Sequence, residues 1–248
     1  MQIRISGGVL DCLVAGTHTG RPSLVLLHGI QGTALVWKPL LADLSRDRLV
    51  VAPHLRGRAG SYSPDDAGQY ALADFAGDLR AVLAALPGPA VLVGWSMGCL
   101  IALEYLRGTG VQDLAGLVLV SGSPCLAATG GQDAVWFQGD TVAALARNAA
   151  DRAKRLQLTE TATNIAVAGS WLAARAADYR DVLPRIALPT LILHGADDPE
   201  CPVAHARIMR DAIPGAKLRL WPGCGHVPMA HDPAAFAREL AGFLPECG

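Results

Sequence analysis

The stretch AVLVGWSMGCLIAL, residues 90–103, decides the fold. The apolar run at 90–93 is typical of a strand covered on both faces, and the apolar run after Gly98 is typical of a helix. Between them lies a Gly-x-Ser-x-Gly sequence centred on Ser96. A serine on a sharp strand-to-helix turn exposes its hydroxyl and needs small neighbours, because the backbone is crowded there. We therefore interpret Ser96 as a nucleophile, rather than as part of a purely structural turn.

Outward from this turn, short apolar runs alternate with amphipathic stretches along the chain. Strands are expected at 2–5, 10–15, 23–27, 49–52, 90–93, 116–120, 190–193 and 217–220. Helices are expected at 34–44, 71–86, 97–106, 202–213 and 233–244. This alternation predicts an α/β fold, with a mostly parallel central sheet flanked by helices.

The alternation is interrupted once, between 124 and 189. No clear strand is found there, and helix-like segments cover 141–156 and 161–177. Open α/β sheets bind ligands at the carboxyl ends of their strands, so an insertion at this point would cover the site. The sequence predicts a core domain formed by 1–123 and 190–248, with a small helical cap inserted at 124–189.

A serine nucleophile requires a base that accepts its proton and an acid that orients the base. On this kind of turn the partners follow in the order serine, acid, histidine. The expected strand at 190–193 leads into His-Gly-Ala-Asp-Asp, which leaves Asp197 and Asp198 as candidates. We favour Asp198 because it lies three residues after Gly195, and Asp197 is then an ordinary loop residue.

Three histidines follow the candidate acid. His226 lies in a glycine-rich loop directly after the expected strand at 217–220, so it can reach over the edge of the sheet. His205 lies inside an expected helix and His231 at the start of another, which favours packing or capping roles. The predicted catalytic residues are Ser96, Asp198 and His226.

Acyl transfer also requires backbone N–H groups around the developing oxyanion. One donor is expected from Met97, the residue after the nucleophile. The second is expected from Ile30, in the loop at 28–32. His28 precedes the serine, so we expect it to order this loop rather than act as the base.

Large apolar side chains are candidates for the wall of a substrate pocket, although each of them is equally suited to the core. The four pocket candidates are Trp95, Trp37, Trp136 and Phe137. Trp171 and Met229 are further candidates of the same kind.

Composition excludes several other classes of protein. The chain has 248 residues, 17% of them charged, and a net charge of −1. These values predict neither a nucleic-acid nor a membrane partner. Six scattered cysteines show no metal-ligand spacing, so no metal or other cofactor is expected. The N-terminus does not resemble a signal peptide. Together with the scattered cysteines, this predicts reduced thiols and a cytoplasmic location. The oligomeric state cannot be inferred.

Basic residues crowd one stretch of the expected cap. They are Arg147, Arg152, Lys154 and Arg155. An ordinary solvated helix face is the simpler interpretation. The alternative is a docking patch for an anionic substrate tail or an acidic carrier protein.

Four motifs together resemble the α/β-hydrolase superfamily over nearly the whole chain. They are His-Gly-x-x-Gly at 28–32, Gly-Trp-Ser-Met-Gly at 94–98, Gly-x-x-Asp at 195–198 and Gly-His at 225–226. The sequence is most similar to the short-capped carboxylesterase branch, which includes pimeloyl-ACP methyl ester esterases and cofactor-free haloperoxidase-like esterases. One segment departs from the family pattern, because His54 stands where an aspartate is usual.

This resemblance implies a small-molecule substrate, a carboxylic ester, thioester or lactone, that is hydrolysed through a Ser-His-Asp triad and an acyl-enzyme. A carrier-linked ester is one form that such a substrate can take. Hydrolysis of C–C bonds and acyl transfer use the same triad and stay as alternatives. A non-catalytic binding protein on the same fold is a third alternative, because fold does not fix function.

Overall fold

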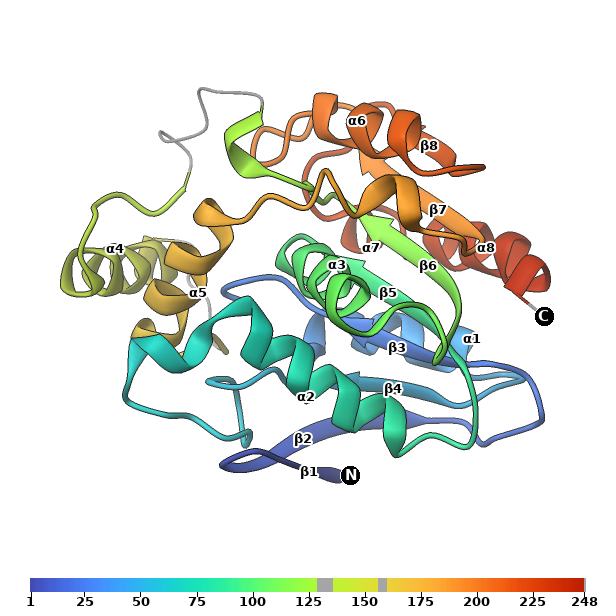
Figure 1. Ribbon diagram of the computed structural model, residues 1–248, viewed down its shortest axis with the longest axis horizontal. Helices are drawn as coiled ribbons and strands as arrows, with labels where there is room; N and C mark the ends of the chain where they lie inside the picture. Colours follow the sequence, from blue (N-terminus) through green and yellow to red (C-terminus); the bar gives the residue numbers. More distant parts are fainter. Residues whose placement is uncertain (129–135, 156–159, 248) are drawn as a thin grey trace.

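Eight strands form one sheet in the computed structural model, which describes residues 1–128, 136–155 and 160–247 (Figure 1). The spatial order is β1-β2-β4-β3-β5-β6-β7-β8. Only the β1–β2 and β2–β4 pairs are antiparallel, and the others are parallel. The strands are β1 (Gln2–Ile5), β2 (Gly8–Ala15), β3 (Ser23–Leu27), β4 (Val50–Pro53), β5 (Ala90–Trp95), β6 (Leu114–Val120), β7 (Thr190–Gly195) and β8 (Lys217–Trp221).

Helices cover both faces of this sheet (Figure 1). One face carries α2 (Leu72–Ala84), α3 (Met97–Thr109) and α6 (Ala204–Ala212), and the other carries α1 (Leu41–Leu44), α7 (Pro228–His231) and α8 (Pro233–Phe243). The predicted fold class is therefore confirmed, with strand positions that differ from the prediction by at most two residues at either end.

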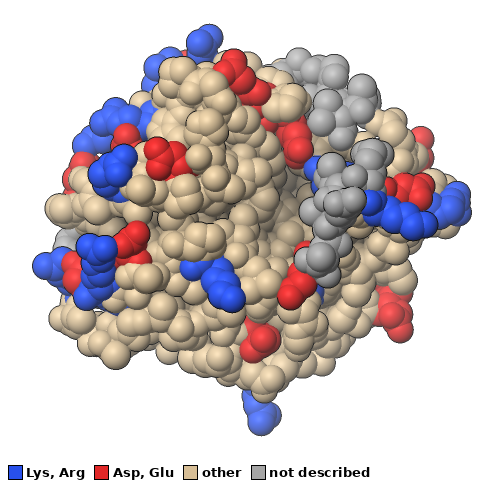
Figure 2. Space-filling model, turned by 180° about the vertical axis from the view of Figure 1, so that it is seen from behind, with Lys and Arg blue, Asp and Glu red and all other residues tan. Residues whose placement is uncertain are grey.

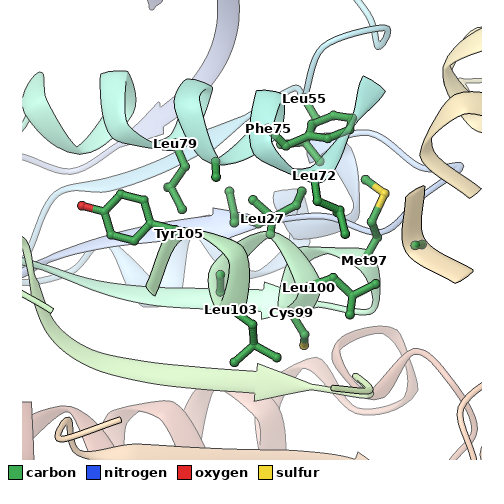
Figure 3. Close-up of a cluster of buried hydrophobic side chains, with 14 of the residues drawn as sticks. Leu27, Leu55, Leu72, Phe75, Leu79, Met97, Cys99, Leu100, Leu103 and Tyr105 are labelled. Carbon is green, nitrogen blue, oxygen red and sulfur yellow. The ribbon is translucent and has the colours of Figure 1, made fainter. Parts of the chain in front are cut away.

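Alternation along the strands divides the core into two layers. On β5, Leu92 faces the layer beneath α2 and α3, whereas Val91 and Val93 face the layer beneath α1 and α8. Figure 3 shows part of the first layer, where Phe75 and Leu79 of α2 and Leu100 of α3 meet Leu27 of β3. Strands buried on both faces need apolar residues at every position, which is why their sequences are almost wholly apolar.

The predicted helix at 34–44 differs from the structure in type. Residues Ala34–Leu40 form a 3₁₀ helix and only Leu41–Leu44 are α-helical. Pro39 has no N–H and its ring clashes with the preceding turn of an α-helix, so it favours the tighter form here.

Between β6 and β7 the described residues form helices and one isolated bridge, but no strand. The α-helices are α4 (Val142–Arg155) and α5 (Asn164–Ala176), and Leu126–Ala128 and Leu183–Arg185 form short 3₁₀ helices. Helices α4 and α5 pack on each other beside the sheet (Figure 1). Whether this segment is a separate cap on a core domain stays a prediction.

All six cysteines lie in the described residues, where each is buried and unpaired. Burial raises the pKa of the Cys12 and Cys247 thiols to about 11 and that of Cys99 to about 12. No helix of the described ranges has the length and apolar character to cross a membrane.

Buried histidines make the fold sensitive to acid. His28 donates its Nδ1–H to the carbonyl oxygen of Gly29 at 2.8 Å, and its Nε2 accepts the Leu55 N–H at 3.1 Å. A second proton on the ring would break the bond to Leu55. Burial accordingly lowers the pKa of His28 to about 3 and that of His205 to about 4.

We expect the free energy of unfolding to fall as the pH drops below about 6.5, the ordinary pKa of histidine. The pKa of these groups is lowered in the folded state, so the unfolded chain takes up their protons first and stability is lost towards pH 4. His28 alone accounts for roughly 2 kcal/mol between pH 8 and pH 5. Guanidinium titrations at several pH values measure the slope of the free energy of unfolding against pH.

His28→Gln should reduce the slope, since the amide keeps both hydrogen-bonding roles without titrating. His231→Gln, at an exposed position, is the matched control and should leave it unchanged. An equal slope in both variants would contradict the assignment.

Candidate active site

Ser96 lies on the turn between β5 and α3, in a backbone conformation that non-glycine residues rarely adopt. Its φ is 55° and its ψ is −116°. Two glycines make the turn possible. A Cβ on Gly94 would approach the carbonyl oxygen of Gly98 to 2.5 Å, and one on Gly98 would approach that of Leu27 to 2.7 Å. Strain of this kind costs about 1–3 kcal/mol and persists only where the surrounding structure imposes it.

The structure brings Ser96, His226 and Asp198 into one hydrogen-bonded chain. His226 Nε2 lies 2.9 Å from Ser96 Oγ, and His226 Nδ1 lies 2.8 Å from Asp198 Oδ2. Asp198 is buried, and its other oxygen accepts the N–H groups of Glu200 and Cys201, both at 2.9 Å. The carboxylate is thus fixed by its own loop while it orients the imidazole. This is the geometry that a general base and its orienting acid require.

The alternative acid and bases lie elsewhere. The Asp197 carboxylate is exposed and accepts the N–H of Gly223 at 2.8 Å. His205 Nδ1 lies 2.8 Å from Ser123 Oγ, and His231 is exposed on α7. None of these three groups contacts Ser96 within the part of the chain that the structure describes.

The two predicted oxyanion donors flank Ser96. Ile30 and Met97 line the same cavity as Ser96, and neither N–H has an acceptor among the described residues. Met97 is the first residue of α3, so its free N–H follows from its position at the helix start. Both N–H groups are thus available to donate a hydrogen bond.

A buried arginine holds the loop that carries Ile30. Arg58 donates to the carbonyl oxygens of Ile30 and Arg56, and to Ser170 Oγ of α5 at 3.4 Å. Burial lowers its pKa to about 9, so it stays charged at neutral pH. No carboxylate pairs with it in the described ranges. This role of Arg58 was not predicted, because nothing in the local sequence distinguishes it from an exposed arginine.

Two cavities meet at Ser96. The first has a volume of about 20 Å³ and mostly apolar walls, with Leu100 of α3, Leu126 after β6 and Trp171 of α5 among them. The second is wider, about 280 Å³, and contains His226 together with Gln31, Arg152 and Glu200. A volume of 20 Å³ holds little more than one water molecule. The two sides of the nucleophile therefore differ in size, and Arg152, Glu200 and His226 line only the wider one.

Trp95 and Trp136 line the wider cavity, as predicted for pocket residues, and Trp171 lines the narrow one. Trp95 donates its Nε1–H to the carbonyl oxygen of His226 at 2.8 Å, and Trp136 donates to that of Glu200 at 2.9 Å. Both rings thus support the loops that carry the base and the acid.

Three other pocket candidates do not line either cavity. The prediction for Trp37 is wrong, because its ring is fully buried against Phe236 on the α1–α8 side of the sheet. Met229 is buried in the same layer. Phe137 lies behind the cavity wall, where its ring contacts those of Trp136 and Trp171.

A polar pair in the wider cavity was not predicted. Arg152 of α4 contacts Glu200 Oε1 at 3.2 Å and Gln31 Oε1 at 2.5 Å, and it lies 5.6 Å from the centre of the Phe137 ring. Glu200 Oε2 lies 3.7 Å from His226 Nε2. In the sequence Arg152 is one of four basic residues that crowd a short stretch, and only the fold shows that it enters the site.

The rest of that cluster is exposed where it is described. Arg147 and Lys154 lie on the outer side of α4, and the side chain of Arg155 is outside the described part of the structure. The face in Figure 2 is hollowed near its centre, with acidic and basic side chains interspersed around the hollow. The described residues include no group of three or more histidine, cysteine or carboxylate side chains suited to a metal ion.

Comparison with known proteins points to one family. A model described as "Alpha/beta hydrolase family" matches residues 24–239. The pimeloyl-[acyl-carrier protein] methyl ester esterase of Aromatoleum aromaticum is 31% identical, over 86% of this chain and 94% of that protein. The protein of the same name from Edwardsiella ictaluri is 31% identical, over 90% and 93%. The crystal structure of the esterase RhEst1 from Rhodococcus sp. ECU1013 aligns with a TM-score of 0.81 and 27% identity, over 100% of this chain and 98% of that one.

Replacing either aspartate of the acid loop by asparagine separates the two candidates. We expect Asp198→Asn to lower kcat by a factor of order 10⁴, since an amide favours the wrong imidazole tautomer and cannot stabilise imidazolium. Asp197→Asn should cost less than about tenfold, because its carboxylate contacts only a backbone N–H. Steady-state kinetics of the two purified variants gives the ranking, and the reverse order would assign the acid to Asp197.

Proposed function

We propose that this chain, which belongs to the alpha/beta hydrolase family, hydrolyses carboxylic esters through an acyl-enzyme formed on Ser96. The observation that carries the proposal is the chain of hydrogen bonds from Ser96 through His226 to Asp198, at 2.9 and 2.8 Å. Esterase relatives support the reaction class.

In this mechanism His226 Nε2 takes the proton of the Ser96 hydroxyl as Oγ attacks the ester carbonyl carbon. The N–H groups of Ile30 and Met97 stabilise the resulting oxyanion. His226 then gives the proton to the leaving alcohol, and the acyl group stays on Oγ. Water enters in place of the alcohol, and the same steps release the acid and free Ser96.

The position of His226 fixes the direction in which the substrate lies. The leaving oxygen receives its proton from Nε2, so the alcohol part occupies the wider cavity that contains His226. The acyl part then occupies the narrow apolar cavity on the other side of Ser96. A short acyl chain fits this cavity, whereas a long chain requires its walls to move.

A carrier-linked ester is a second candidate substrate, favoured by the names of two relatives and by the exposed Arg147 and Lys154 on α4. The same triad can hydrolyse thioesters, lactones and C–C bonds, and it can transfer the acyl group to an acceptor other than water. These reactions stay as alternatives. The cytoplasmic location also stays a prediction.

Ser96→Ala tests the mechanism directly. We expect a loss of about 10⁴–10⁶-fold in kcat with an unchanged fold, since only the nucleophilic oxygen is removed. A fluorophosphonate probe should label the wild type and not the variant. Turnover near the wild-type rate in Ser96→Ala would rule out the acyl-enzyme, and a wild type that resists the probe would favour a non-catalytic binding protein.

Charge reversal on α4 tests whether the substrate is linked to an acidic carrier protein. With an ester on an acyl carrier protein, Arg147→Glu should lower kcat/KM, and more strongly at low salt, because attraction between exposed charges is screened within about 8 Å at physiological ionic strength. A small neutral ester should react as before. Arg238→Glu makes the same charge change at an exposed position on α8 and serves as the control. Equal effects on both substrates would leave Arg147 as an ordinary surface residue.

A further inference from the structure

The Glu200 carboxylate lies beside the reacting centre although the triad does not use it. Its Oε2 is 3.7 Å from His226 Nε2, on the side that faces Ser96. Its Oε1 is bound to the Arg152 guanidinium at 3.2 Å. Oε2 has no hydrogen-bond donor among the described residues, so a group in the wider cavity can donate to it.

Arg152 completes a polar wall at the same place. The side chains of Arg152 and Glu200 are 15% and 23% exposed, so both are largely removed from water and both line the wider cavity. A guanidinium and a carboxylate side by side offer N–H donors and an acceptor oxygen. A hydroxyl group, which donates and accepts, fits such a pair.

Arg152 and Glu200 lie where the water or alcohol that attacks the acyl-enzyme must enter. The acyl-enzyme is attacked from the side on which the alcohol left, because the attacking oxygen gives its proton to His226 Nε2. The leaving-group site and the acceptor site are therefore the same cavity. The Glu200–Arg152 pair in this cavity is therefore placed to contact the alcohol that leaves and the alcohol that enters.

We propose that Glu200 and Arg152 form an acceptor subsite for hydroxylated alcohols, so that polyol esters are preferred substrates and polyols preferred acyl acceptors over alkyl alcohols. This inference rests on the proposed function. In the transfer step the alcohol O–H proton passes to His226 Nε2, the alcohol oxygen bonds to the acyl carbon, and the bond from that carbon to Ser96 Oγ breaks. The proton then returns to Oγ.

Partition of a single acyl-enzyme tests the subsite. The enzyme is acylated with p-nitrophenyl acetate in the presence of equal concentrations of glycerol and 1-propanol. Both acceptors have a three-carbon skeleton. Glycerol has two primary hydroxyl groups, whereas 1-propanol has one. The ratio of glyceryl acetate to propyl acetate reports on the acceptor site alone, since both products come from one intermediate.

The wild type should favour glycerol by about tenfold beyond the twofold statistical factor, equivalent to about 1.4 kcal/mol. Glu200→Leu should remove this preference, and Glu200→Gln should keep part of it. Arg152→Leu combined with Glu200→Leu should match the single Leu variant, which excludes an effect of an unpaired guanidinium. Asp197→Asn removes a carboxylate of the same loop that points away from the cavity, so it should leave the ratio unchanged.

A wild-type ratio near two, or a preference for glycerol that persists in Glu200→Leu, would overturn the subsite while leaving the esterase intact. Failure of the wild type to release p-nitrophenol would overturn the proposed function and this inference with it. The two failures are separated by whether p-nitrophenol appears.

Discussion

The turn from β5 into α3 is the constraint on which the site depends. Ser96 is held at a positive φ because Gly94 and Gly98 let the two sides of the turn approach each other and β3. The same turn frees the Met97 N–H at the start of α3. Since β3 is the neighbour of β5, the loop after β3 brings Ile30 to the other side of the serine. A change in this turn would move Ser96 relative to all of its partners at once.

The order of the strands in the sheet determines where the acid and the base of the site lie. On the other side of β5 lie β6, β7 and β8, all parallel to it. The loop after β7 supplies Asp198 and the loop after β8 supplies His226, so residues far apart in sequence converge at one edge. Such convergence at the carboxyl ends of parallel strands is a property of the topology, which is why a motif-based prediction of these residues was possible.

What the sequence could not predict depends on long-range contacts. The fold class and the family resemblance are confirmed, because strand periodicity and the glycine spacing around Ser96 are local signals. Trp37 was misassigned, since an apolar pattern indicates burial without saying which face of the sheet a side chain joins. Glu200 and Arg152 were missed because they meet only when α4 folds over the loop after β7. Arg58 and Arg152 also link α5 and α4 to the loop carrying Ile30, which no local pattern reveals.

The six buried cysteines have a practical consequence for chemical labelling. A thiol reacts as the thiolate, and burial blocks the approach of a reagent. Burial also raises the pKa of five of these thiols, those of Cys12, Cys99, Cys201, Cys224 and Cys247. The native thiols of the folded protein are thus poor targets for maleimides. A single cysteine introduced at an exposed position, such as Arg147 on α4, would carry a fluorophore at one known place without removal of any native cysteine. Energy transfer from the native tryptophans to this fluorophore would then report how far α4 lies from them in solution.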